Sequence, residues 1–144
     1  MPDLHETALA RLRADGQRYT TNRRSVVEEL ERADRPVSIP ELLVSLKDLA
    51  QSSAYLTLSV LERAGVVRRL VTQDEFARYE LAEDLTEHHH HLICSRCGGI
   101  EDFTVPDSLE TELERILRRV ASRRGFASAS HRLDLVGTCA SCSS

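Results

Sequence analysis

The cysteines of this chain stand in two Cys-x-x-Cys pairs, Cys94 with Cys97 and Cys139 with Cys142, and there are no others. Two such pairs supply four thiolates, which is the ligand set of a tetrahedral zinc site. Free core thiols and a disulfide are the alternatives to a metal. We favour structural zinc, because the paired spacing occurs at both places and the metal would join the two ends of one small domain.

Four consecutive histidines run from His88 to His91, shortly before the first cysteine. If residues 88–93 form a strand, their side chains alternate between its two faces. His89 and His91 then share one face and His88 and His90 share the other, with about 7 Å between the Cα atoms of each pair. We therefore predict two separate metal sites. A solvated polar strand is the alternative, as is an engineered tag, although a tag would stand at a terminus.

Acidic side chains that could complete these sites stand on neighbouring segments. The candidates are Glu80 before the histidines, Glu101 and Asp102 after them, and Glu110 or Glu114 further along the chain. Each acid taken singly is more often a solvated surface charge. The presence of four histidines strengthens the interpretation of Glu80 and Asp102 as ligands. His131 is the remaining histidine of this half of the chain.

Apolar spacing and cap signals predict the elements that position these residues. In the first half we expect helices over 4–14, from Thr20-Thr21-Asn22 onward, from Ser38 onward, and from Ser52 or Ser53 onward. The third begins with a Ser38–Glu41 capping box and the fourth ends at Gly65. Strands at 66–71 and 76–81 follow, joined by the polar turn Thr72–Glu75. Helices followed by a hairpin are the order of a winged helix-turn-helix.

A domain boundary is predicted at Ala82–Glu87, where most residues are polar or small. Beyond it we predict strands at 88–93 and about 100–104, a helix that opens at Pro106-Asp107, and a strand at 131–136. The fold class is therefore α+β. It comprises a winged-helix domain over residues 1–84 and a small α/β domain with structural zinc over residues 85–144.

Composition excludes several classes of protein. No stretch approaches the roughly 20 apolar residues that span a membrane, and the start lacks a basic region followed by an apolar run. We therefore expect a cytoplasmic protein, in which reduced thiols favour a metal over disulfides. The net charge is −4, so any DNA binding must use a local basic patch.

Candidate DNA contacts come from two predicted helices. A positively charged patch at the turn into the second helix is the best candidate for contacts with DNA phosphates. It consists of Arg18, Arg23 and Arg24. The fourth helix has no Lys or Arg before Arg63. It offers polar positions at Gln51, Ser52, Ser53, Tyr55 and Thr57, although Tyr55 could instead be a core aromatic.

Several short motifs stand in order along the chain. They are Gly16-x-Arg18-x-Thr20-x-x-Arg23, Ser53-Ala54-Tyr55-Leu56-Thr57-Leu58, Leu61-Glu62-x-x-Gly65-Val66-Val67, Arg78-Tyr79-Glu80-Leu81, the run His88–Cys97 with Gly98, Ser130-His131-Arg132-Leu133, and Gly137-x-Cys139-x-x-Cys142. With these motifs the chain resembles the ferric-uptake-regulator family of metal-responsive repressors over nearly its whole length. The histidine–cysteine block is the most specific of them.

The resemblance implies a homodimer, in which each protomer has a winged-helix DNA-binding domain and an α/β dimerisation domain. It implies structural zinc on the cysteines and a regulatory divalent metal, which would be iron, zinc, manganese or nickel. By motif position, the sensing site would contain Glu80, His89, His91 and Asp102, and a second site would contain His88, His90, Glu110 and His131. Tyr55 would contact a major groove and Arg18 would reach a minor groove.

Some residues depart from the family pattern. Leu56 stands directly after the tyrosine of the fourth helix, where the family often has an arginine that contacts DNA. Arg35 stands before a proline, where many iron and peroxide sensors have a histidine, and an arginine cannot bind a metal. Arg68 and Ala82 stand where zinc sensors tend to have Asp and Cys. The sensed metal is therefore not identified by analogy.

These features together predict a repressor of metal-homeostasis genes that binds two-fold operators when its sensing site is metallated. A peroxide sensor of the same architecture, in which bound iron catalyses the oxidation of a ligand histidine by peroxide, is the alternative. An enzyme is disfavoured, because the sequence has no His-Glu-x-x-His motif. The two cysteine pairs also suit a metal clamp better than a redox couple.

Overall fold

The computed structural model describes residues 3–72, 76–86, 88–127 and 130–143. Its elements in chain order are α1 (Leu4–Ala14), α2 (Thr21–Ala33), β1 (Val37–Ser38), α3 (Ile39–Ser45), α4 (Gln51–Arg63), β2 (Val67–Val71), β3 (Ala77–Leu81), the 3-10 helix η1 (Glu83–Leu85), β4 (His90–Cys94), β5 (Ile100–Phe103), α5 (Asp107–Arg123), β6 (Asp134–Gly137) and α6 (Ala140–Ser143). Helices and sheets thus combine in an α+β fold. Within the described ranges, no helix is long and apolar enough to cross a membrane.

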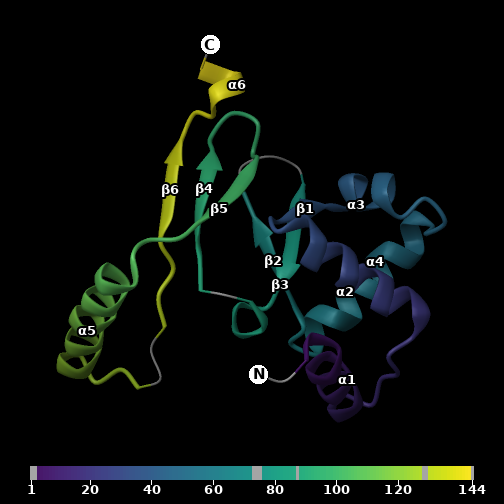
Figure 1. Cartoon of the computed structure of the whole chain (residues 1–144), viewed down its shortest axis with the longest axis horizontal. Helices are drawn as coiled ribbons and strands as arrows, with labels where there is room; N and C mark the ends of the chain where they lie inside the picture. Colours follow the sequence, from purple (N-terminus) through teal and green to yellow (C-terminus); the bar gives the residue numbers. More distant parts are fainter. Residues whose placement is uncertain (1–2, 73–75, 87, 128–129, 144) are drawn as a thin grey trace.

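The elements from α1 to β3 form a winged helix, with a three-stranded sheet in the order β1-β3-β2 beside the helices (Figure 1). α2 begins where the Thr20 hydroxyl accepts a hydrogen bond from the Arg23 N–H at 3.3 Å, and α3 begins with the predicted Ser38–Glu41 capping box. The helices share a buried aliphatic core. Its fully buried members include Leu12, Val26, Val27 and Leu61.

β2 and β3 form the wing, and their register decides what stands beside the histidines. Antiparallel pairing places Arg68 of β2 opposite Glu80 of β3. Because β1 pairs with the other edge of β3, Glu80 lies on a central strand and is only 5% exposed. A carboxylate buried to this extent requires neighbouring positive charge or a metal.

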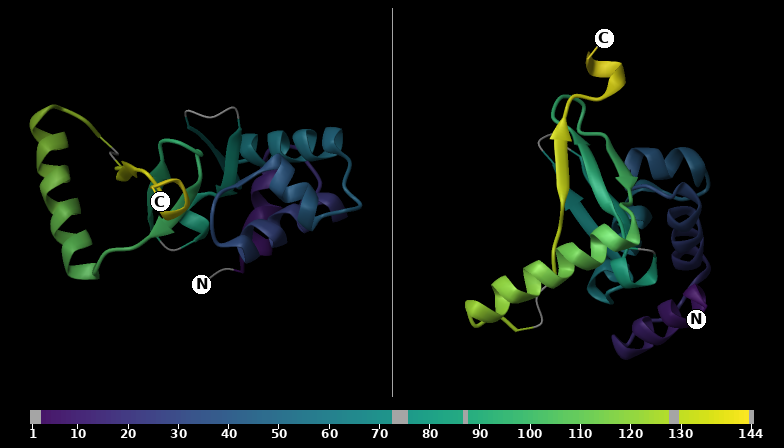
Figure 2. Two further views of the ribbon diagram at one scale, coloured as in Figure 1. Left: turned by 90° about the horizontal axis from the view of Figure 1, so that it is seen from above. Right: turned by 60° about the vertical axis from the view of Figure 1, so that its left-hand side comes forward.

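The second sheet has the order β5-β4-β6, in which β4 runs antiparallel to β5 and parallel to β6. His91 on the central strand lies opposite Asp102 on one side and Asp134 on the other. In Figure 1 and in the left view of Figure 2, the strands of the second sheet lie between α5 and the helices of the winged helix. Although α5 is 17 residues long, it has no buried residue. Its apolar stripe is therefore left open in a single protomer.

The predicted helix over 4–14 and the predicted order of elements are confirmed, and the corrections concern boundaries. α4 begins at Gln51 rather than at Ser52 or Ser53, because its N-cap is the extended residue Ala50. β4 begins at His90 rather than at residue 88, because its ladder with β5 begins at that histidine. β6 begins at Asp134 rather than at residue 131, because its pairing with β4 begins there. The short elements β1, η1 and α6 were not predicted. Residues 73–75 of the predicted turn, and Glu87 at the predicted boundary, lie outside the described residues.

Candidate metal centres and the DNA-binding face

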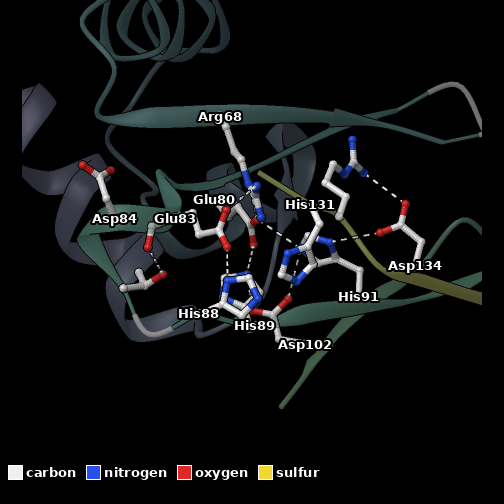
Figure 3. A network of polar contacts seen from close by, with 12 residues as sticks. Arg68, Glu80, Glu83, Asp84, His88, His89, His91, Asp102, His131 and Asp134 are labelled. Atoms are coloured by element: carbon white, nitrogen blue, oxygen red, sulfur yellow. Dashed lines mark hydrogen bonds and ion pairs between the residues drawn. The ribbon is translucent and has the colours of Figure 1, made fainter. Parts of the chain in front are cut away.

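Glu80, His89, His91 and Asp102 come together between the wing and the second sheet (Figure 3), and we call them the Glu80 cluster. Nε2 of His89 and Nε2 of His91 lie 3.1 and 3.0 Å from the two Glu80 oxygens. The same nitrogens each lie 3.6 Å from an oxygen of Asp102. One donor atom from each residue lies within 4.8 Å of the others. Two imidazoles and two carboxylates at this spacing suit one divalent cation.

Burial and neighbouring charges shift the pKa values of both acids in the Glu80 cluster. Burial by itself would raise the pKa of Glu80, but the hydrogen bond with His91 and the charge of Arg68 lower that pKa to about 2. Burial raises the pKa of Asp102 to about 6, and the neighbouring Glu80 carboxylate adds to this increase. Among the described residues, nothing forms a hydrogen bond with Oδ1 of Asp102. A buried carboxylate that has an oxygen without a hydrogen bond, and whose two oxygens each lie near a histidine, fits a bound divalent metal.

His88, His90, Glu110 and His131 form a second group, which we call the Glu110 cluster. Its carboxylate comes from the first turns of α5. The Nε2 atoms of three histidines lie 2.9, 2.7 and 2.9 Å from the Glu110 oxygens, in the order His88, His90 and His131. Burial would raise the pKa of Glu110, but hydrogen bonds with His90 and His131 lower it. Three imidazoles around one ionised carboxylate fit a second divalent cation.

Two other acids considered as ligands belong to neither cluster. Glu114 forms an ion pair with Arg118 at 2.8 Å on the same helix, so Glu110 is the acid of α5 that faces the histidines. Glu101 is exposed. The structure thus brings together the two predicted sets of side chains, with consecutive histidines divided between them. That these sets bind metals remains a prediction.

The Sγ atoms of Cys94, Cys97, Cys139 and Cys142 lie within 4.8 Å of one another, and we call this group the cysteine cluster. All four cysteines are described, and none of them forms a disulfide. The backbone N–H groups of Cys97, Cys139 and Arg96 each lie 3.4 Å from Sγ of Cys94, and they lower its pKa to about 6. Hydrogen bonding to Cys139 raises the pKa of Cys142 to about 12. Four converging sulfurs, one of which is already stabilised as a thiolate, fit a tetrahedral zinc ion.

The chain also matches a known family of proteins. The family model described as the ferric uptake regulator family matches residues 14–136, which is most of the chain. The chain belongs to the ferric uptake regulator family. Members of this family are transcriptional regulators that bind DNA, and the cysteine cluster fits their structural zinc.

Individual members of the family align over nearly the full chain. The peroxide operon regulator of Bacillus subtilis (strain 168) is 29% identical over 140 residues, which covers 94% of this chain and 91% of the relative. The Helicobacter pylori ferric uptake regulator Fur has a similar structure, with a TM-score of 0.74, 30% identity, and coverage of 99% of this chain and 95% of that one. A zinc-bound manganese uptake regulator gives a TM-score of 0.65 and 31% identity, with coverage of 96% and 99%.

Two residues beside the clusters were not predicted to take part in them. Nε of Arg68 donates a hydrogen bond to Oε1 of Glu80 at 2.7 Å. Glu83, in η1, forms an ion pair with Nδ1 of His88. The cross-strand register of the predicted hairpin is the signal that would have found the first contact. The second depends on the path of the chain between the wing and β4, which the sequence pattern does not determine.

Arg35, which stands where many metal sensors of the family have a histidine, forms an ion pair with Glu41 at 2.7 Å. It also lines a cavity of about 440 Å³, together with Glu80, His89 and Asp102. The guanidinium therefore stands near the Glu80 cluster without supplying a ligand. This arrangement leaves the cluster with the four donors described above.

The predicted basic patch lies at the start of α2. Arg18 and Arg24 are exposed, and Arg23 is half-buried and donates a hydrogen bond to the backbone oxygen of Arg18 at 2.6 Å. Arg24 forms an ion pair with Glu28 at 3.1 Å, which reduces its attraction for phosphate. Arg18 is thus the member of the patch that projects most freely.

The predicted reading helix, α4, presents an exposed tyrosine and leucine beside this patch. Tyr55 is 56% exposed and Leu56 is 70% exposed, and Ser53 is half-buried. A shallow hollow of about 200 Å³ between the starts of α2 and α4 is lined by Arg23, Ser53 and Leu56, among others. Thr57 is only 7% exposed, but it also lines this hollow, so its contact with DNA stays a prediction.

Substitution of single cysteines tests the zinc assignment. Cys94→Ser or Cys142→Ser should remove about one zinc ion per protomer and lower the melting temperature, because binding of the metal is coupled to folding. Elemental analysis and thermal denaturation of the same preparations measure both effects. Ser141→Ala, between the second pair of cysteines, is the matched control and should change neither. Full zinc content and a native melting curve in either cysteine variant would show that the four-thiolate site is wrong.

Proposed function

We propose that this chain is a repressor of metal-homeostasis genes that binds a two-fold operator as a homodimer when the Glu80 cluster holds a divalent metal. One observation carries the proposal: the cluster joins two parts of the fold. Glu80 comes from the wing strand β3, whereas His91 and Asp102 come from β4 and β5 of the second sheet. We infer that these parts are two domains, residues 1–84 for DNA binding and residues 85–144 for metal binding and dimerisation.

A metal that binds donors on both domains would limit their relative motion. The bound ion would supply charge and a coordination geometry, while the chain orients the donors and excludes water around Glu80 and His91, which are 5% and 2% exposed. Two DNA-binding domains that are already correctly spaced lose less entropy when they bind a two-fold operator. By reciprocity, operator DNA must then tighten metal binding by the same factor.

The open apolar surface of the second domain supports a homodimer. Leu109, Ile116 and Val120 of α5 are 55%, 45% and 52% exposed, and Leu135 and Val136 of β6 are each 60% exposed. An amphipathic helix and a strand edge with this much apolar surface are typical of an interface between subunits. Dimerisation would also bring two reading helices to one operator, as a two-fold site requires.

Related proteins of known structure agree with metal-dependent regulation. The H. pylori Fur structure is reported to reveal three functional metal binding sites. This chain likewise brings together three groups of side chains of the types that coordinate metals, the Glu80, Glu110 and cysteine clusters. Metal binding by all three groups is part of the proposal, with zinc on the cysteines and a divalent regulatory metal on the Glu80 cluster.

A peroxide-sensing repressor is the second candidate function. It is favoured by the names of relatives, the peroxide operon regulator of B. subtilis and the peroxide-responsive repressor PerR of Staphylococcus aureus, the latter being 28% identical over 141 residues. Arg35 counts against it, because this position offers no imidazole for an iron ion. We therefore place metal-dependent repression first.

Single histidine substitutions separate metal sensing from folding. His89→Ala or His91→Ala should abolish metal-dependent operator binding but leave the dimer and its zinc intact, because both histidines belong to the Glu80 cluster. His88→Ala or His90→Ala alters the other cluster and should have a different, milder effect. Gel-shift titrations with and without added divalent metal, combined with size-exclusion chromatography, measure these properties. Equal responses from all four variants would contradict the division into two clusters.

Substitutions on the DNA-binding face should separate electrostatic affinity from base reading. Arg18→Ala should weaken binding to all sequences and reduce the salt dependence by a slope of roughly 1 for each lost phosphate contact. Tyr55→Ala should cost about 1–3 kcal/mol on the matched operator and relax base preference at one position of each half-site. Leu56→Arg should tighten binding. Gel shifts at two salt concentrations provide the measurement, and three variants that bind like wild type would show that α4 is not the reading helix.

Peroxide treatment distinguishes the two candidate functions. If the chain senses metal rather than peroxide, dilute hydrogen peroxide should leave the operator affinity of the iron-loaded and the manganese-loaded protein equally unchanged. A peroxide sensor would instead lose DNA binding only in the iron-loaded form. Mass spectrometry of the peptide that contains His89 and His91 is the decisive measurement. An added oxygen atom on that peptide in the iron-loaded protein would support the second candidate and overturn the first.

A further inference from the structure

The positively charged guanidinium of Arg68 directly contacts Glu80 in the Glu80 cluster (Figure 3). Its Nε and Nη2 atoms lie 2.7 and 2.6 Å from the same carboxylate oxygen, Oε1 of Glu80. Nε2 of His91 lies 3.0 Å from that oxygen as well. The oxygen that faces His91 is therefore shared with a guanidinium, which the direct cross-strand pairing of β2 and β3 holds in place.

The charge of Arg68 opposes the binding of a cation. When both are ionised, Glu80 and Asp102 carry two negative charges, and the guanidinium neutralises one of them. Affinity for divalent ions increases with the charge of the ligand set, and a fixed cation in contact with a ligand repels an incoming one. The Glu80 side chain is 6% exposed and that of Arg68 is 25% exposed, so water and salt screen this repulsion only weakly.

A second acceptor for the guanidinium lies within reach. Nη1 of Arg68 is 3.8 Å from Oε2 of Glu83. The other oxygen of Glu83 forms an ion pair with Nδ1 of His88, whose Nε2 lies 2.9 Å from Glu110. Arg68 is thus positioned between the two histidine clusters, in contact with a ligand of one and with the carboxylate that orients a ligand of the other.

We propose that Arg68 competes with the regulatory metal for Glu80 and so sets the metal affinity of the Glu80 cluster, with Glu83 receiving the guanidinium when the metal is bound. This inference rests on the proposed function, because it takes the Glu80 cluster as the regulatory metal site. Transfer of the guanidinium to Glu83 changes the carboxylate that holds His88. Occupation of one cluster therefore alters the other, and the effect is reciprocal.

Titration with Co²⁺ in the absence of DNA tests the competition. The parent protein is a zinc-replete His90→Ala variant, in which the Glu110 cluster lacks one imidazole, and visible absorption and competition with a chelator at pH 8 give the Kd. Arg68→Met should lower the Kd about tenfold or more. Arg69→Met is the matched control, since it removes the same charge from the next residue of β2. Arg69 pairs with Glu62 at 3.9 Å, so this variant should change the Kd less than about threefold.

Glu83→Gln tests the second acceptor. It should raise the Kd in the parent protein, because the guanidinium then has no alternative partner, and should have little effect once Arg68→Met is present. Additive effects of the two substitutions would overturn the role of Glu83. An Arg68→Met variant with the Kd of the parent, or a higher one, would overturn the competition.

Thermal denaturation of each metal-free variant establishes that it is folded, and Arg68→Lys provides a second variant if Arg68→Met is not. Lysine keeps the charge but lacks the two adjacent N–H donors, so its Kd should lie between those of the parent and Arg68→Met. A lysine Kd above that of the parent would contradict the competition. Absence of Co²⁺ binding by the parent protein would overturn the regulatory site itself, whereas normal binding without any effect of Arg68 would overturn only the present inference.

Discussion

Side chains alternate along residues 88–91, and this alternation sends neighbouring imidazoles to opposite sides of one extended segment. His89 and His91 meet Glu80 of the wing, whereas His88 and His90 meet Glu110 of α5. One short segment therefore contacts the winged helix on one side and the long helix of the second domain on the other. β5 and β6 pair with the two edges of β4 and hold it extended. Because β4 contains His90 of one cluster and His91 of the other, both clusters depend on this sheet.

Two carboxylates buried side by side are stable only if positive charge faces them. In the Glu80 cluster Arg68 supplies that charge. Its guanidinium and the hydrogen bond with His91 together keep the pKa of Glu80 low. For Asp102, burial and the neighbouring Glu80 carboxylate outweigh the two histidines and raise its pKa. The interactions that stabilise the metal-free fold thus involve the same oxygen atoms that a metal would use. The metal affinity of the Glu80 cluster would therefore be a difference between these two sets of interactions.

The second domain is incompletely buried as a single protomer. α5 has no buried residue, and Leu135 and Val136 of β6 are exposed. Small domains with little core depend on metals or on partner subunits for stability. The cysteine cluster, which joins the turn after β4 to the segment after β6, and an apolar face suited to a second copy supply both in the proposed assembly.

The sequence by itself determined the features that arise within a few residues: the Ser38 capping box, the helical stripes, the alternation of the histidines and the two cysteine pairs. It also identified both histidine clusters with the help of a family resemblance, but left two acids open for one of them. Only the tertiary structure decided that Glu110 faces the histidines, that Thr57 is largely buried, and that Arg68 and Glu83 lie between the clusters. The physical reason is that these contacts join segments far apart in the chain, whose register and packing arise from the whole fold rather than from local periodicity.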